Sequence, residues 1–98
     1  MTLPDPGFDA VHPSGTVVFR SCRGGYLHSV ALAEGALDSD AHTLAAAVLL
    51  AADVSHLKAV MSIRDEIIDA GFTPSDQIPE PGDLTRAEAT LRDHRLHR

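Results

Sequence analysis

One stretch without glycine or proline, from Asp38 to Ala70, does most to constrain how this chain can fold. Side-chain oxygens in Asp38-Ser39-Asp40 can accept hydrogen bonds from the N–H groups of a first helical turn, and Gly71 is a typical residue after a last turn. Alanine and leucine dominate the stretch, and both lose little side-chain entropy in a helix. The sequence therefore predicts one long helix over about residues 39–70.

The first half of the predicted helix, from Leu44 to Val54, is apolar around almost its whole circumference, so it must be enclosed. The second half has one broad apolar side and one polar side. A chain of 98 residues has little else with which to cover such a helix. We therefore expect a short sheet on one side and a second copy of the chain on another, because burial of apolar surface is the main force available. The residues expected at this homodimer contact are Leu50, Val54, Leu57, Val60, Met61, Ile63 and Ile67.

Two runs before this helix have the composition of β-strands, at residues 16–22 and 26–33. Gly24-Gly25 between them can supply the positive φ that a tight hairpin turn needs. The apolar alternation shifts by one residue within the second run. A strand cannot change face without an extra residue, so we expect a β-bulge near His28-Ser29.

Proline and glycine mark the segments outside this core. Residues 1–14 are expected to be a flexible lead-in, of which only residues 8–12 are apolar enough to lie against the rest as an edge strand or an arm. Residues 72–83 have the composition of a Pro-rich linker. Residues 84–98 are expected to form a C-terminal helix and tail, beginning at the capping-box spacing Thr85-Arg86-Ala87-Glu88.

These elements predict an α+β fold with its core in residues 15–71. A small antiparallel sheet built on the hairpin 16–33 is packed by the long helix, and a short C-terminal helix follows. A hairpin alone would be marginally stable, so the helix has to lie across one of its faces.

Charge and composition exclude several classes of protein. The net charge of -6 argues against a general nucleic-acid binder, which needs clustered lysine and arginine. The apolar run Leu44 to Ala52 is far shorter than the roughly 20 residues that span a bilayer. The N-terminus lacks the features of a signal peptide, and the single Cys22 fits a reducing compartment. We expect a cytoplasmic protein without membrane insertion.

Arg20 and Arg23, beside Gly24-Gly25, form a small basic hairpin tip. Guanidinium groups and exposed N–H groups could contact an anion or an acidic partner segment there. The alternative is a solvated turn in which arginine serves solubility. The glycine pair is not a phosphate-binding loop, because no Lys-Ser/Thr follows it.

Asp53, His56 and Arg64 lie on or beside the apolar sector of the long helix. A carboxylate paired with histidine or arginine at a dimer contact is the structural interpretation, since a buried charge needs a partner. Catalysis by an Asp-His pair lacks a placed nucleophile, and Cys22 is expected to pack rather than react. The sequence has no enzyme motif, and we expect no catalytic residue, cofactor or metal.

The hairpin and helix together resemble a known family. The resemblance is to mycobacterial proteins associated with type VII secretion, of the EspD and EspH type, and it runs without a gap from Gly15 to Ala59. It is carried by Gly15-Thr16-Val17-Val18-Phe19, Gly25-Tyr26-Leu27-His28-Ser29-Val30-Ala31-Leu32, Leu44-Ala45, Ala52-Asp53 and Lys58-Ala59.

More distantly, the strand-strand-helix order is similar to the YbaB nucleoid-associated family, whose members are homodimers. This chain differs in having no helix before Gly15 and in being acidic, and both differences argue against DNA binding. The resemblances imply a non-enzymatic, dimeric interaction protein, an accessory or chaperone-like factor with a protein partner in type VII secretion. A YbaB-like DNA-binding or regulatory protein is the alternative.

Overall fold

The fold of this chain is α+β, as the sequence predicts, in a computed structural model that describes residues 5–96. Its elements follow one another along an elongated molecule of 49 × 29 × 16 Å. They are η1 (Pro6–Phe8), β1 (Ala10–Val11), β2 (Val17–Ser21), β3 (Leu27–Leu32), η2 (Glu34–Asp38), α1 (Ala41–Asp69) and α2 (Pro81–Asp93).

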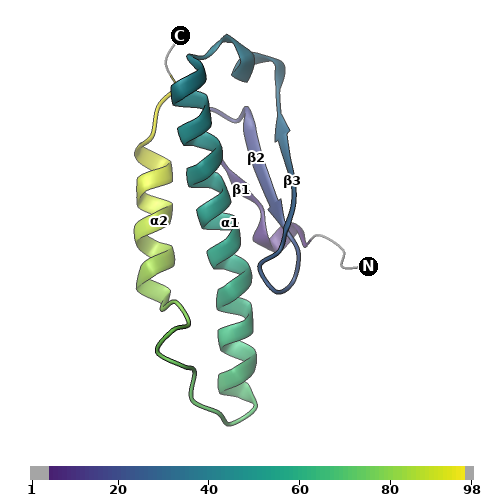
Figure 1. Cartoon of the computed structure of the whole chain (residues 1–98), viewed down its shortest axis with the longest axis vertical. Helices are drawn as coiled ribbons and strands as arrows, with labels where there is room; N and C mark the ends of the chain where they lie inside the picture. Colours follow the sequence, from purple (N-terminus) through teal and green to yellow (C-terminus); the bar gives the residue numbers. More distant parts are fainter. Residues whose placement is uncertain (1–4, 97–98) are drawn as a thin grey trace.

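The elements form a sheet with a pair of helices against it. The strands are antiparallel in the order β1-β2-β3, so β2 is central. Helix α1 lies between α2 and the strands, and α2 runs antiparallel to it (Figure 1). The C-terminal half of α1 continues beyond the hairpin turn, so the sheet covers only part of its length (Figure 1).

The hairpin forms as predicted, and its register contains the expected irregularity. Gly24 and Gly25 have φ angles of 95° and 86°, which residues with a side chain rarely adopt. Arg20 is opposite Ser29 and Ser21 is opposite Leu27, which leaves His28 as an extra residue in β3. The prediction of a β-bulge near His28-Ser29 is confirmed.

Small residues let α1 approach the sheet closely. Val17 and Phe19 alternate with exposed or half-buried residues along β2 and point toward the helix. Facing them on α1 are Ala47 and Ala51, each 0% exposed. Because these side chains are small, the buried apolar area is modest, and polar contacts matter more than in a larger core.

A buried chain of hydroxyl hydrogen bonds fixes α1 on the sheet. Ser55 Oγ lies 2.6 Å from the carbonyl oxygen of Phe8 and 2.7 Å from Ser21 Oγ. A carbonyl only accepts, so the Ser55 hydroxyl donates to Phe8 and accepts from Ser21. This pair of bonds connects α1 to η1 and to the central strand.

Both ends of α1 lie close to the predicted ones. Gly71, with φ of 88°, follows the last turn, and its N–H donates to the Ile68 carbonyl while the Phe72 N–H donates to Ile67. These two bonds define a Schellman motif. At the other end Asp40 is the N-cap residue, but its carboxylate accepts from the Thr43 hydroxyl at 3.0 Å and caps no N–H.

Helix α2 begins four residues before the start expected at Thr85, and this corrects the predicted boundary between linker and helix. Pro81 occupies the first turn, where its missing N–H costs nothing. The capping box is built by Glu80 and Asp83, whose carboxylate accepts from the Glu80 N–H at 2.8 Å. Thr85 instead donates its hydroxyl to the Pro81 carbonyl inside the first turns.

Residues 8–12 of the predicted lead-in contribute an edge strand, which is one of the two arrangements expected for them, and the flexibility of the lead-in stays a prediction. Ala10 and Val11 pair with Phe19 and Val18 as the edge strand β1. Ala10 is buried against α1, and the segment gains enough contact to be held. Residues 1–4 of the lead-in and 97–98 of the expected tail lie outside the described residues.

By length and composition alone, α1 could cross a membrane. An 18-residue window within it has a mean hydropathy of 1.6, and 33% of that window is buried inside the chain. The core helix of a globular protein meets the same criterion, because it is equally apolar. The absence of membrane insertion therefore stays a prediction.

We predict that Ser55→Ala lowers the free energy of unfolding by about 1–3 kcal/mol, because it leaves the Phe8 carbonyl and the Ser21 hydroxyl buried without their partner. Urea denaturation followed by circular dichroism measures this. Ser62→Ala, on the same side of α1 at a half-buried position, is the control and should change stability by less than about 0.5 kcal/mol. Equal losses in both variants would contradict the role of the hydroxyl chain.

We predict that Gly71→Ala lowers the free energy of unfolding by about 1 kcal/mol. No atom lies within 4 Å of an added Cβ there, so the cost comes from the backbone conformation alone. Gly82→Ala in α2, whose added Cβ would lie 3.6 Å from the Arg86 side chain at an ordinary φ, should leave stability unchanged or raise it. The same urea titration compares the two, and a neutral Gly71→Ala would contradict the Schellman assignment.

Candidate interaction surface

An apolar surface remains open where β3 borders α1. Val30 and Leu32 are opposite Phe19 and Val17, so their side chains point to the helix-bearing side of the sheet. Phe19 and Val17 are buried there, yet Val30 and Leu32 are each 42% exposed. The contact of α1 is mainly with β2 and reaches β3 only weakly, so these side chains lie beside the helix rather than under it.

Leu49 continues this surface on α1. It lies two turns before His56, on the same side of the helix. His56 Nδ1 is 2.9 Å from the Gly25 carbonyl oxygen in the turn just before β3, and η2 joins the end of β3 to the start of α1. Leu49 therefore projects along β3, and it is 70% exposed. We call Val30, Leu32 and Leu49 the open apolar row.

The outer edge of β3 is also open, since no strand other than β2 pairs with β3 within residues 5–96 (Figure 1). The Ala33 N–H donates to Thr16, so by the antiparallel alternation the N–H and C=O groups of Val30 and Leu32 point away from β2. Natural sheet edges are usually protected by lysine, proline or inward charges. β3 contains none of these residues, and its bulge at His28 leaves Ser29 to Leu32 in regular pairing with β2.

The predicted dimer residues fall into two groups. Val54 and Leu57 are 2% and 7% exposed, because α2 and the sheet cover them within the same chain. Five others are half-buried along α1, namely Leu50, Val60, Met61, Ile63 and Ile67. A second copy can therefore reach part of the predicted face, but Val54 and Leu57 are inaccessible while α2 is in place.

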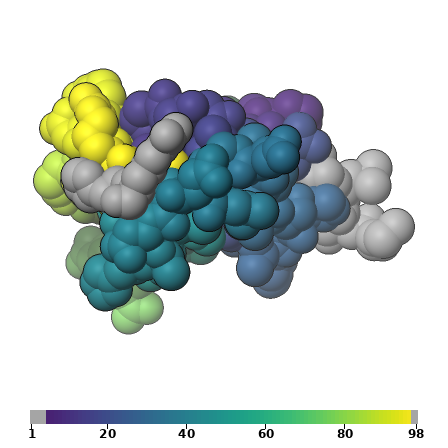
Figure 2. Space-filling view, turned by 90° about the horizontal axis from the view of Figure 1, so that it is seen from above, coloured from purple at the N-terminus to yellow at the C-terminus, as the bar shows by residue number. Residues whose placement is uncertain are grey.

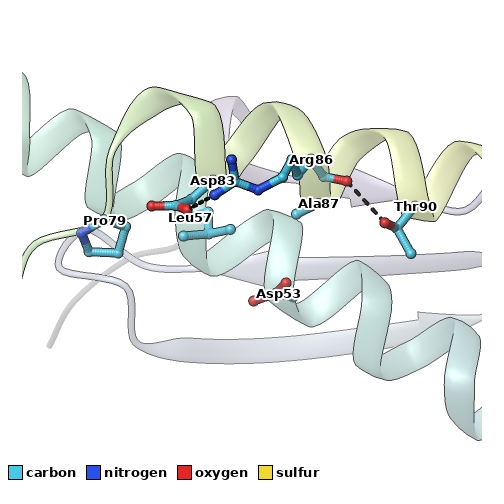
Figure 3. Close-up of a pocket in the computed structure, with 7 residues that line it drawn as sticks. All are labelled: Asp53, Leu57, Pro79, Asp83, Arg86, Ala87 and Thr90. Carbon is cyan, nitrogen blue, oxygen red and sulfur yellow. Dashed lines mark hydrogen bonds and ion pairs between the residues drawn. The ribbon is translucent and has the colours of Figure 1, made fainter.

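A shallow cleft of about 410 Å³ runs between α1 and α2 (Figure 3). Its polar groups are engaged with one another: Asp83 pairs with Arg86, and the Thr90 hydroxyl donates to the Arg86 carbonyl at 3.0 Å. Asp53 and Leu57 line the cleft from α1, and Leu57 supplies apolar surface there (Figure 3). The groups around this cleft do not converge on a common point, so it offers no ligand site.

The structure does not bring Asp53, His56 and Arg64 together as the predicted polar cluster. His56 contacts the hairpin turn, and Arg64 Nη1 is 3.4 Å from the Pro79 carbonyl oxygen in the linker. Asp53 lines the cleft against α2. Asp53 and Arg64 lie on the same side of α1 but are about three turns apart along it, so each meets a different part of the chain.

Arg20 and Arg23 each pair with a carboxylate of the same chain. Arg20 Nε is 3.2 Å from Asp9 Oδ2, toward β1, whereas Arg23 pairs with Glu66 on α1. The two guanidinium groups thus point to different elements and are largely neutralised. A shared anion site at the hairpin tip gains no support from this geometry.

A polar cluster that the sequence did not predict joins the first turn of the sheet to the end of α2. His12 is only 1% exposed, and its Nε2 lies 2.9 Å from His94 Nδ1. Its other nitrogen, Nδ1, is 2.8 Å from Ser14 Oγ and accepts the Ser14 N–H at 3.1 Å. Burial, and then the nearby His94 and Arg95, lower the pKa of His12 below its usual 6.5.

This cluster resembles a nucleophile-base-orienter arrangement, but it lacks a place for an oxyanion. The N–H groups of Ser14, Gly15 and Thr16 are already bonded to His12 Nδ1, His12 O and Ser14 Oγ. No backbone donor of this turn is left to stabilise developing charge. The geometry therefore carries no acyl-transfer chemistry.

The cluster also does not form a metal site. The two imidazole rings meet with centroids 5.2 Å apart and planes at 81°, so the facing nitrogens point at each other along one hydrogen bond. A shared metal needs lone pairs that converge on a third point. Within residues 5–96 no group of three or more His, Cys, Asp or Glu could hold a metal ion. Cys22, at the end of the first hairpin strand, is 4% exposed and shielded from solvent.

Comparison with known proteins places the chain among mycobacterial relatives. It is 56% identical over 98 residues to "Uncharacterized protein Mb0029" of Mycobacterium bovis and, equally, to "Uncharacterized protein Rv0028" of Mycobacterium tuberculosis. Each match covers 100% of this chain and 97% of the relative. No solved structure matches. A family model described as "Protein of unknown function (DUF2694)" matches residues 1–97, and the chain therefore belongs to the DUF2694 family.

Proposed function

We propose that this protein is a non-enzymatic interaction module that acts as a homodimer through β3. The observation that carries the proposal is the open apolar row, Val30, Leu32 and Leu49, beside an unprotected strand edge. Apolar side chains and unpaired backbone groups are both costly to leave in water, and a partner strand satisfies both at once.

A second copy fits this edge because antiparallel pairing is self-complementary. Two β3 strands related by a two-fold axis present the same outward N–H and C=O groups to each other. The two sheets then join into one, with both α1 helices on the same side. Leu49 of each copy approaches the apolar row of the other, which encloses the side of α1 that the chain itself leaves open.

An association with type VII secretion, as an accessory or chaperone-like factor, is the finer part of the proposal. It is supported by the resemblance of Gly15–Ala59 to the EspD and EspH type. The dimer would leave the distal part of α1 free for a partner, where Ile68 and Phe72 are 50% and 71% exposed. A cytoplasmic location belongs to the same proposal.

We do not propose the YbaB-like DNA-binding alternative. Arg20 and Arg23 are paired with carboxylates, and the net charge is -6, so phosphate contacts would have to be made against repulsion.

We predict that the protein is a dimer near 100 µM and that Leu49→Asp weakens the dimer roughly 30-fold, which corresponds to a loss of about 1 kcal/mol at each of its two symmetric positions. Leu32→Asp should act in the same direction. Analytical ultracentrifugation gives the masses, and circular dichroism checks that the exposed substitutions leave the fold intact.

Phe72→Asp is the matched control, because Phe72 is as exposed as Leu49 but lies past the end of α1. It should leave the dimer unchanged. A wild-type chain that stays monomeric, or that instead sediments with lipid vesicles, would overturn the proposed homodimer. Equal weakening by Phe72→Asp would move the interface away from β3.

The secretion partner is tested by affinity purification from a mycobacterial lysate at low and high salt. Recovery of type VII secretion proteins in a salt-resistant complex, lost with a distal-α1 variant such as Ile68→Asp, would support the finer proposal. Recovery mainly of nucleic acid that is lost at high salt would overturn it.

A further inference from the structure

We propose that the hydrogen bond between His12 and His94 is a proton-operated latch that holds the C-terminal end of α2 against the sheet. Protonation of the pair opens this end and exposes apolar residues of α1 that α2 covers. The inference is independent of the proposed dimer, because α2 lies on the opposite side of α1 from β3 (Figure 1).

The latch joins segments far apart in the sequence. His12 follows β1, and His94 is the residue immediately after α2. Figure 2 shows the end of α2, in yellow, beside the purple segment that precedes β2. A contact at this position acts on the whole end of the helix, since residue 94 lies past its last turn.

The surrounding bonds assign the protons of the closed latch. The Ser14 N–H can only donate, so His12 Nδ1 must be an acceptor without a proton. His12 is then neutral with its proton on Nε2, and it donates this proton to His94 Nδ1. The closed state therefore requires one tautomer of His12 and an unprotonated Nδ1 on His94.

An additional proton breaks this arrangement wherever it binds. On His94 Nδ1 it would face the Nε2–H of His12, and on His12 Nδ1 it would face the N–H of Ser14. Either way two donors point at each other. A proton at either site disrupts a hydrogen bond of His12, so the consequence belongs to the pair rather than to one ring.

The charges around the pair favour opening. The positive charge of Arg95, like that of a protonated His94, lowers the pKa of His12. On the other side of β1, Lys58 of α1 and Glu88 and Arg92 of α2 line a cleft of about 360 Å³. Two of these groups are positive and one is negative, so they do little to stabilise an additional proton on the histidine pair.

The direction of the pH effect follows from the lowered pKa of His12. The closed latch binds a proton less tightly than the open one, so closing is favoured above the usual pKa near 6.5. As the pH falls below that value the open state takes up protons first. The population of the open state grows by up to about tenfold for each unit by which opening raises the pKa of His12.

Helix α2 is held lightly enough for one contact to matter. Leu91 is its buried residue, at 5% exposure, while Leu84 and Ala87 are half-buried. Clefts lie on both of its sides, against α1 and against β1. Opening exposes Val54 of α1, which lines a cleft with Leu91, and its apolar side chain then becomes accessible to an amphipathic helix.

The test is amide hydrogen exchange of the full chain at pH 7.5 and pH 5.5, corrected for the intrinsic exchange rate. We expect protection in the last turns of α2 to fall about tenfold more than protection in α1. His94→Ala should give low protection in α2 at both pH values. His94→Asn, whose amide oxygen can accept the His12 proton, should keep α2 protected at pH 7.5 and lose less protection than the wild type at pH 5.5, because only His12 can then take up the additional proton.

His42→Asn, at an exposed position on α1, is the control and should behave like the wild type. Two results would overturn the latch: a loss of α2 protection at pH 7.5 in His94→Asn as large as that in His94→Ala, or a loss of protection at pH 5.5 that is equal in α1 and α2. Should His94→Ala fail to fold, imidazole ¹⁵N chemical shifts of the wild type at pH 7.5 decide the matter. A His12 that is not protonated on Nε2 alone would then refute the proposal.

Discussion

The structure depends on one constraint: the rest of the chain is too small to cover all of the apolar surface of α1. The sheet reaches about as far as His56, where the hairpin turn meets the helix. The remaining sides are divided between α2, which shields Val54 and Leu57, and solvent. Two other features follow from this helix: the alanine-rich contact between α1 and β2, and the uncovered strand β3.

The close approach of α1 to β2 has a geometric cost. Ala47 and Ala51 bring the helix axis near the central strand, and the Ser55 hydroxyl fixes it there. A helix held so near the middle of a narrow sheet cannot also cover both edges. Because α2 occupies the β1 side, β3 is the strand left uncovered. The open apolar row thus results from packing elsewhere in the molecule.

Local patterns in the sequence were sufficient to predict α1, the hairpin and the bulge at His28, because each depends on neighbours within a few residues. The start of α2 was placed too late, since Thr85-x-x-Glu88 and Glu80-x-x-Asp83 are both capping-box spacings and only Pro81 distinguishes them. The contact between His12 and His94 could not be predicted, because it joins residues 82 positions apart. A histidine within an otherwise apolar segment was the one available signal.

The two edges of the sheet differ in a way that limits growth. β1 is only two residues long, which is too short to template a further strand, and the chain turns directly after His12. β3 offers a flat stretch that ends at the bulge of His28, where the extra residue disrupts regular pairing. A sheet with one usable edge can add a single neighbour and then has none to offer. Pairing through β3 alone would therefore stop at two copies, although this strand carries no protective charge.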